Sequence, residues 1–163
     1  MNITFKGNPV TLVGNKLKVG DTLNAFTTVK NDLSPLALGD TNGVRIFLSV
    51  PSLDTAVCEQ EVNTFNKRAS EISGVTIYTV SMDLPFAQAR WCGTNGVNNV
   101  ITISDYKDKE FAKATGTCIK EIGLLTRAVF VVNNNNELVY VQYVSEITDL
   151  PNFDEILNAA KNI

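Results

Sequence analysis

The stretch VRIFLSVPSLDTAVCEQEVNTFNKRASEISGVTIYTV, residues 44–80, decides the fold. It begins with a nearly continuous apolar run at 44–50, which is typical of a strand buried on both faces. Apolar residues then recur in steps of four, three, four and three, as on one face of a helix. They are Cys58, Val62, Phe65, Ala69 and Ile72. Gly74 ends the helix, and a second β-type run covers 75–80. This order predicts a right-handed βαβ unit with parallel strands.

Patterns before this stretch predict further strands. Residues 3–5 alternate between apolar and polar, a turn at 7–8 follows, and a second strand covers 10–13. We therefore expect an N-terminal β-hairpin. A short strand is expected at 25–29. The segment NDLSPLALGDTNG, residues 31–43, is rich in turn-forming residues and is expected to be a loop.

Patterns after this stretch indicate both helices and strands. In chain order we expect a short helix from Pro85 that carries Gln88, Trp91 and Cys92, a strand at 100–103, a helix at 106–114, strands at 127–132 and 137–144, and a helix at 152–161. The four asparagines at 133–136 favour a hairpin turn, because asparagine tolerates positive φ. The whole order predicts an α/β, thioredoxin-like fold, with a central mixed sheet flanked by helices and an N-terminal β-hairpin.

The length and the net charge of the chain limit the number of domains and the kinds of binding partner that we expect. The chain has 163 residues with no linker or internal repeat, so we expect residues 1–163 to form a single domain. Its 14 basic and 17 acidic residues give a net charge of −3, which disfavours general binding to nucleic acids or anionic membranes. We see no signal-peptide pattern and no apolar run of about 18 residues. We therefore expect a cytoplasmic protein with reduced thiols.

The chain contains no histidine. This excludes Ser-His-Asp and Cys-His catalytic groups, zinc sites of the HExxH type and histidine proton switches. The three cysteines are too few for a disulfide-rich secreted scaffold, and no histidine can complete a Cys/His zinc site. We therefore expect neither a metal nor a cofactor.

Cys58 falls in the first turn of the helix predicted after the apolar run. A thiolate there is stabilised by the helix dipole and by unpaired backbone N–H groups. If Thr55 is the N-cap, Cys58 is at N3, where a capping-box glutamate would accept the N-cap N–H, and a thiolate can use the same geometry. The alternative is that Cys58 is a small buried core residue, as free cysteines often are. Position alone leaves both interpretations open.

The other two cysteines are far from Cys58 along the chain. Cys92 follows it by 92 − 58 = 34 positions, so the two do not form a CxxC pair. A disulfide between them would have to join two different helical segments. Cys118 precedes the penultimate predicted strand, and we interpret it as a packing residue.

Two cysteine-containing segments resemble those of a known family. PSLDTAVC, residues 51–58, resembles the peroxidatic-cysteine signature of the peroxiredoxins, in the form used by the bacterial thiol peroxidases, an atypical 2-Cys subfamily. DLPFAQARWCG, residues 83–93, is similar to the resolving-cysteine segment of that subfamily. NNVITIS at 98–104 and RAVFVV at 127–132 also resemble it, so the similarity runs nearly end to end.

The resemblance implies a role for each residue that matches the family pattern. Cys58 would be the peroxidatic nucleophile and Cys92 the resolving cysteine of the same chain. Three further residues would assist: Thr55 by a hydrogen bond to the thiolate and the peroxide, Pro51 by shielding the sulfur from water, and Arg127 by stabilising the thiolate and the developing charge. Cys118 lies outside the pattern, so a side disulfide or a second resolving thiol stays open.

The resemblance also implies an activity and partners. The chain would reduce hydrogen peroxide and organic hydroperoxides through a Cys58 sulfenic acid, which Cys92 would resolve as an intramolecular disulfide. Thioredoxin would reduce that disulfide, and a homodimer is typical of the family. Because Cys58 lies on the apolar stripe of its helix, we expect disulfide formation to need local unwinding of the helix start or of the Cys92 segment.

Two other classes of function fit the same fold. A thiol–disulfide oxidoreductase without peroxide chemistry would ordinarily carry a CxxC pair, and reduction of insulin would reveal it. A non-catalytic thioredoxin-like binding module would leave Cys58 with the reaction rate of an ordinary thiol. In that case Arg127 and Thr55 would be replaceable without consequence.

Overall fold

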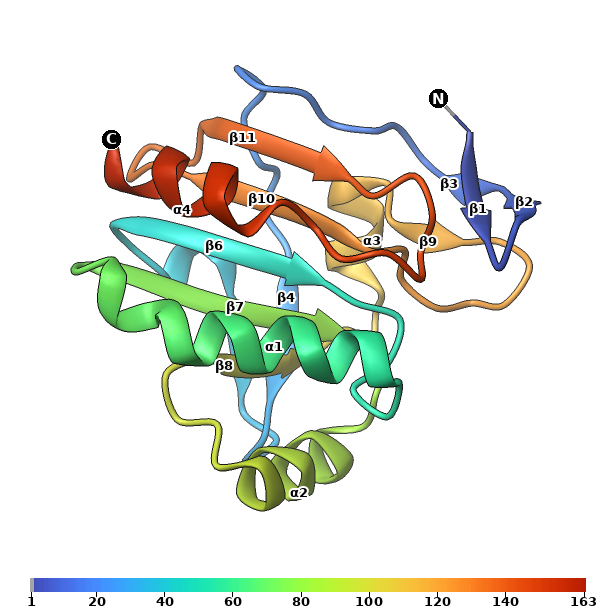
Figure 1. Cartoon of the computed structure of the whole chain (residues 1–163), viewed down its shortest axis with the longest axis horizontal. Coiled ribbons are helices and arrows are strands. Elements are labelled where there is room, and N and C mark those ends of the chain that lie inside the picture. The colour runs from blue at the N-terminus through green and yellow to red at the C-terminus, as the bar shows by residue number, and fades with distance from the viewer. Residues whose placement is uncertain (1) are drawn as a thin grey trace.

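A seven-stranded mixed sheet forms the centre of the computed structural model, which describes residues 2–163 (Figure 1). In spatial order its strands are β11 (Leu138–Tyr143), β10 (Ala128–Val132), β6 (Val44–Ser49), β7 (Val75–Ser81), β8 (Ile101–Ser104), β4 (Thr27–Lys30) and β5 (Pro35–Ala37). The central strands β6, β7 and β8 are parallel, and the outer strands pair antiparallel. The helix α1 (Ala56–Arg68) connects β6 to β7, so the predicted βαβ unit is confirmed.

Side chains of the central strands alternate between two apolar layers. On β6, Ile46 and Leu48 belong to one buried cluster and Phe47 to the other. Figure 1 shows α1 and α4 (Phe153–Lys161) in front of the sheet and α3 (Glu110–Thr115) behind it. Each face of the sheet is therefore covered, which is why its central strands are almost continuously apolar. A mixed sheet with helices on both faces confirms the predicted fold class.

The helix α2 (Pro85–Asn95) lies beside the β8 side of the sheet. Pro85 occupies its first position, where no N–H is needed, and Gly96 ends it with a left-handed backbone (φ 64°). Trp91 of α2 packs in the same apolar cluster as Cys58. The helix predicted from Pro85 is thus confirmed, and it carries Cys92 on its last turns.

The expected N-terminal hairpin is present as β1 (Ile3–Phe5) and β2 (Asn8–Val10). Its turn lies at Lys6 and Gly7, one residue earlier than predicted, and both have positive φ. The predicted second strand is divided, because β3 (Leu12–Val13) leaves β2 and pairs with β9 (Cys118–Ile119). This long-range pairing places the hairpin against the segment around residue 120.

Three predictions of local structure were wrong in part. The expected loop at 31–43 contains the edge strand β5 and a 3₁₀ turn at 38–40; an edge strand tolerates Pro35. The helix expected at 106–114 is the shorter α3, because Asp105 accepts the N–H groups of residues 111 and 112 and so marks the helix start. The helix expected to begin near residue 56 and to end before Gly74 ends at residue 68 and continues as a 3₁₀ turn.

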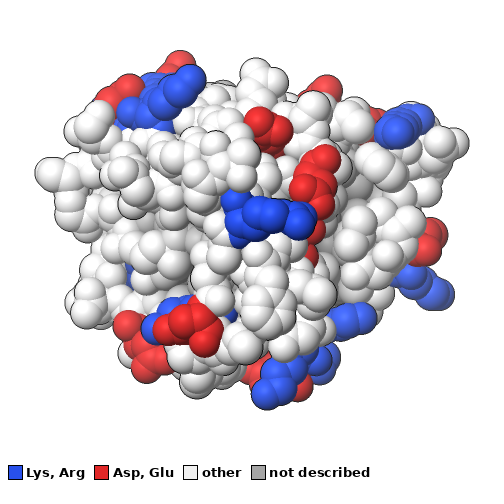
Figure 2. All heavy atoms as spheres, turned by 90° about the horizontal axis from the view of Figure 1, so that it is seen from below, with Lys and Arg blue, Asp and Glu red and all other residues white. Residues whose placement is uncertain are grey.

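No helix within residues 2–163 has both the length and the apolar composition that crossing a membrane requires. Figure 2 shows the face at the α2 end of the molecule, where basic and acidic side chains are interspersed among larger uncharged areas. Both signs of charge on one face agree with the small net charge of −3. That the chain binds neither nucleic acid nor a membrane surface stays a prediction.

Candidate active site

Cys58 is fully buried in the first turn of α1. The helix begins at Ala56 with Thr55 as its N-cap, so Cys58 occupies the predicted N3 position. The expected capping-box geometry is wrong, however. The Thr55 N–H donates to the carbonyl oxygen of Ser52 at 3.2 Å, so a tight turn, and not the Cys58 sulfur, satisfies that donor.

The Cys58 sulfur instead faces Arg127, which immediately precedes β10. The Arg127 Nη2 donates to Cys58 Sγ at 3.2 Å, and Nη1 is paired with the Glu61 carboxylate. Nε donates to the carbonyl oxygen of Ile147 at 2.8 Å. Three partners, two on α1 and one in the segment after β11, therefore hold the planar guanidinium in one orientation. Burial disfavours its charged form, but Glu61 and Cys58 outweigh that effect and raise the pKa of Arg127 above its usual value.

Glu61 is a site residue that the sequence analysis missed. Its side chain is fully buried one turn after Cys58, on the face of α1 that packs against the sheet. Within the described residues its second oxygen, Oε1, has no hydrogen-bond partner. Burial raises the pKa of Glu61 to about 7, and the charge and hydrogen bond of Arg127 only partly offset this effect. The available signal was a carboxylate three positions after a cysteine, on an otherwise apolar stripe.

We expect Glu61→Gln to change the dependence of stability on pH. A carboxyl group with a pKa near 4.5 when unfolded and about 7 when folded binds its proton more tightly in the folded protein. The free energy of unfolding therefore falls as the pH rises from about 4.5 to about 7. Glutamine does not titrate. Over that pH interval the free energy of unfolding of the variant should therefore rise by on the order of 3 kcal/mol relative to that of the parent. Urea unfolding of both proteins at pH 4.5 and 7.5 measures this, and a pH-independent difference would contradict the raised pKa.

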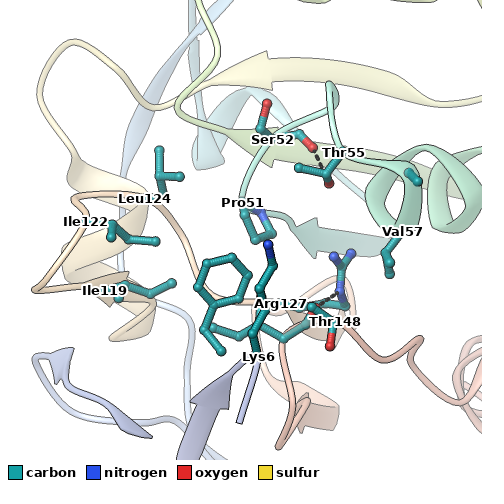
Figure 3. Close-up of a pocket in the computed structure, with 13 residues that line it drawn as sticks. Lys6, Pro51, Ser52, Thr55, Val57, Ile119, Ile122, Leu124, Arg127 and Thr148 are labelled. Carbon is teal, nitrogen blue, oxygen red and sulfur yellow. Dashed lines mark hydrogen bonds between the residues drawn. The ribbon is translucent and has the colours of Figure 1, made fainter. Parts of the chain in front are cut away.

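An apolar cavity of about 390 Å³ lies beside Arg127. Pro51, which is buried, stands between the guanidinium and the main apolar wall. Figure 3 shows this arrangement, with Arg127 on one side of Pro51 and Ile119, Ile122 and Leu124 on the other. Phe5 and Lys6 of the N-terminal hairpin complete the cavity. Pro51 and Arg127 were expected from the sequence, whereas the apolar wall was not, because the residues of the wall come from distant segments.

Thr55 lines the same cavity and is exposed. Its hydroxyl donates to the carbonyl oxygen of Ser52 at 3.0 Å (Figure 3). In this structure the hydroxyl is therefore engaged with the turn before α1. A hydrogen bond from Thr55 to a bound peroxide or to the thiolate stays a prediction, and it requires the hydroxyl to rotate away from Ser52.

Cys92 packs against the apolar cluster that contains Cys58, but its polar contact and its burial differ from those of Cys58. It is half-buried on α2, and its sulfur is 3.4 Å from the hydroxyl oxygen of Thr102 on β8. Thr102 in turn donates to Asn31 at 3.2 Å. The groove beside Cys92 shares no lining residue with the cavity beside Arg127, and all three cysteines are free thiols. The structure thus brings Pro51, Thr55, Cys58 and Arg127 together but leaves Cys92 at a separate groove.

Cys118 is half-buried on β9, opposite Val13 of β3. Its neighbour Ile119 lines the cavity, whereas Cys118 itself does not. Within residues 2–163, no cluster of three or more His, Cys, Asp or Glu side chains could hold a metal ion. The chemistry that this arrangement supports is that of a thiol held against an arginine at a helix N-terminus.

Comparisons with known proteins agree with this geometry. Residues 18–157 match the model of the Redoxin family. A thiol peroxidase of Clostridium acetobutylicum is 58% identical over 161 residues, which cover 99% of this chain and 98% of that protein. A thiol peroxidase of Bacillus subtilis is 50% identical over 160 residues, with 98% and 96% covered. The solved structure of a peroxiredoxin-like protein from Aquifex aeolicus matches with a TM-score of 0.93 at 42% identity, covering 99% of this chain and 96% of that one.

These relatives span nearly the whole chain at identities well above the level at which fold alone is shared. They confirm the resemblance first drawn from the segments at 51–58 and 83–93. The chain therefore belongs to the Redoxin family and, within it, to the thiol peroxidases.

Proposed function

We propose that this chain reduces hydroperoxides by a two-cysteine cycle in which Cys58 attacks the peroxide and Cys92 resolves the product. The observation that carries the proposal is the Arg127 guanidinium, 3.2 Å from the Cys58 sulfur and at the wall of an apolar cavity. A purely structural cysteine needs neither a buried cation nor an adjoining cavity. Pro51 and Thr55 line the same cavity as Arg127.

Stabilising the thiolate does not by itself account for a peroxidase. For any thiol, lowering the pKa from about 8.5 to about 6 raises the thiolate population at pH 7 roughly thirtyfold. Nucleophilicity falls with pKa, and a Brønsted slope of about 0.45 costs roughly thirteenfold over the same range. The net gain in reaction rate from the lower pKa is therefore about twofold. Transition-state stabilisation must therefore supply most of the rate.

Arg127 is placed to supply that stabilisation. As the Cys58 thiolate attacks, negative charge moves from sulfur onto the oxygen that leaves as the O–O bond breaks. Donors fixed along this line bind the transition state more strongly than the ground state. The guanidinium is held by Glu61 and Ile147 before any substrate arrives, so it needs no reorganisation during the reaction.

The proposed cycle balances in three steps. The Cys58 thiolate takes the terminal peroxide oxygen and becomes a sulfenic acid, while the remaining alkoxide or hydroxide takes a proton and leaves as alcohol or water. The Cys92 thiol then attacks the sulfenic sulfur, forming the Cys58–Cys92 disulfide and releasing water. A dithiol of the thioredoxin type reduces that disulfide and becomes a disulfide itself.

The cavity favours organic hydroperoxides over hydrogen peroxide. Its apolar wall would bury the carbon skeleton of a substrate, which hydrogen peroxide does not have. We expect Ile122→Ser, which removes an exposed part of this wall, to lower kcat/KM for cumene hydroperoxide about tenfold, because each buried methylene contributes roughly 0.8 kcal/mol. The rate with hydrogen peroxide should stay the same. Equal losses for both peroxides would contradict a substrate-binding role.

Further parts of the proposal concern partners and location. We infer that the chain works as one domain of residues 1–163, forms a homodimer and is recycled by thioredoxin. A cytoplasmic location fits the cycle, since a reducing compartment returns Cys58 and Cys92 to thiols after each turnover. No metal or cofactor enters any step.

The experiment that tests the function is a single turnover. Reduced protein is mixed with one equivalent of peroxide, quenched with an alkylating agent and mapped by mass spectrometry. We expect one Cys58–Cys92 disulfide per peroxide consumed, with Cys118 alkylated. Oxidation of Cys58 no faster than that of a free thiol would leave the non-catalytic binding module as the better interpretation.

A further inference from the structure

The resolving step requires a rearrangement that the peroxide-reducing step does not. Cys58 is fully buried against Arg127, and Cys92 contacts Thr102 at a groove separate from the active-site cavity. A disulfide needs Cα atoms within about 7 Å and suitably directed side chains. Before the two sulfur atoms can bond, Cys58 has to leave Arg127 and Cys92 has to leave Thr102, so the turn before α1, the helix α2, or both must move. The contacts that join these two segments contribute to the free-energy cost of that motion.

Asp83 ties them together. It lies two residues before α2, and its carboxyl oxygens accept from the backbone N–H of Leu53 at 2.8 Å and from the hydroxyl of Ser52 at 2.7 Å. Both donors belong to the turn that leads into Cys58. Leu53 is itself buried in the apolar cluster that contains Cys58. One side chain thus fixes the Cys58 turn to the start of the helix that carries Cys92.

The other end of this connection is anchored in the sheet. Asp83 also accepts from the Ser81 hydroxyl at 2.7 Å, and Ser81 is a fully buried residue at the end of β7. Gln88, fully buried on α2, donates to Ser81 Oγ at 3.0 Å and to the carbonyl oxygen of Ile103 at 2.9 Å. Breaking the contact between Asp83 and the turn therefore removes the side-chain hydrogen bonds that join the two cysteine-bearing segments, and leaves the apolar contacts of Leu53 and Trp91 in their shared cluster.

From this connectivity we propose that Asp83 is a positioning residue for the resolving step: its hydrogen bonds to Ser52 and Leu53 hold the closed, peroxide-reducing form and set the rate at which the Cys58–Cys92 disulfide forms. The proposal rests on the proposed function, in which Cys92 is the resolving cysteine. Asp83 lines neither the active-site cavity nor the groove beside Cys92, so it acts on the chemistry only through the segments it joins.

If Asp83 has this role, it affects which of two competing reactions consumes the Cys58 sulfenic acid. In one reaction the Cys58 sulfenic acid condenses with the Cys92 thiol to give the disulfide and water. In the other it reduces a second hydroperoxide to its alcohol and becomes a sulfinic acid, which removes the enzyme from the cycle. Stronger hydrogen bonds from Ser52 and Leu53 to Asp83 slow only the first reaction. Asp83 therefore sets the peroxide concentration at which Cys58 is oxidised to the sulfinic acid.

The test uses Asp83→Asn in the full chain. The variant weakens an acceptor of three hydrogen bonds, two of them from the turn before α1, while keeping the size of the side chain. We expect the Cys92-dependent phase after one equivalent of peroxide to be roughly tenfold faster, the effect of weakening about one such bond. The first, Cys58-dependent phase should change by less than about threefold. The peroxide concentration at which half of the protein is sulfinic should rise about tenfold, as read by mass spectrometry.

Two controls separate this role from general destabilisation. Asp108→Asn removes the same charge at an exposed position away from both segments. Leu138→Val weakens the other buried apolar cluster, which contains neither Cys58 nor Cys92, and should lower the melting temperature without changing the Cys92-dependent phase. Faster amide exchange in residues 51–55 and 83–88 of Asp83→Asn, but not of the controls, is the accompanying structural signature.

The outcomes distinguish this inference from the proposed function. If Cys92→Ser leaves the second phase intact, the proposed function itself fails. If Cys92→Ser removes that phase, but Asp83→Asn leaves it unchanged, slows it or speeds it no more than Leu138→Val does, the role of Asp83 is overturned. A selective acceleration together with higher resistance to sulfinic acid formation supports it.

Discussion

Replacing Cys92 by serine is expected to stop turnover while leaving the first reduction of peroxide intact. In the closed form Cys92 does not line the cavity, and its sulfur contacts Thr102 while that of Cys58 accepts from Arg127, so the sulfenic acid should form at the parent rate. No thiol then resolves it within the chain. We expect steady-state peroxidase activity with thioredoxin and its reductase to fall at least about a hundredfold, since attack by an outside thiol lacks the proximity of Cys92.

Trp91 provides the measurement, because it is the only tryptophan, precedes Cys92 and packs in the same cluster as Cys58. Stopped-flow fluorescence should show a fast phase that Cys92→Ser keeps and a slower phase that it loses. Cys58→Ser should lose both phases and Cys118→Ser should keep both. Full steady-state turnover by Cys92→Ser would rule out Cys92 as the resolving residue.

Replacing Arg127 by methionine is expected to slow the oxidation of Cys58 by about 10²–10³, the usual cost of removing one well-placed donor from a transition state. Methionine preserves most of the apolar volume but donates no hydrogen bond to the sulfur or to the leaving oxygen. The rate constant is measured by stopped flow with reduced protein and excess hydrogen peroxide.

A second effect has to be separated from this one. Removing Arg127 leaves the buried Glu61 carboxylate without its partner, which destabilises a protein by about 3–5 kcal/mol when such a pair is broken. The double variant Arg127→Met with Glu61→Gln removes that unpaired charge. We expect it to recover much of the melting temperature but none of the rate. Recovery of the parent rate in the double variant would show that Arg127 acts on stability alone.

The elements around the site could be predicted because their signals are local. The apolar run at 44–50 and the helical spacing after it identify β6 and α1, and they place Cys58 at N3 without knowledge of any distant residue. Pro85 marks the start of α2 in the same way. Strand β5 was missed because a short edge strand exists only through its pairing with β4, which overrides the turn preference of its residues.

Glu61 and the cavity wall could not be predicted for a different reason. A buried carboxylate on an apolar stripe is stable only because it is paired with Arg127, which comes 127 − 61 = 66 positions later and directly before β10. In the same way Phe5 and Ile122 line one cavity because β3 pairs with β9 and brings the N-terminal hairpin to that segment. Such contacts depend on topology, which spacing along the chain does not reveal.

The sequence by itself determined the chemistry that this protein has available: no histidine, a cysteine at a helix N-terminus, a second cysteine in a matching segment, and an arginine before a buried strand. The tertiary structure alone decided that Arg127 is held by Glu61 against the Cys58 sulfur, that Cys92 rests at another groove, and that Asp83 joins the two segments. The physical reason is the separation along the chain between the residues that interact. Helix starts and strand runs follow from neighbouring residues, whereas the orientation of a buried charge follows from partners that only the folded sheet brings within hydrogen-bonding distance.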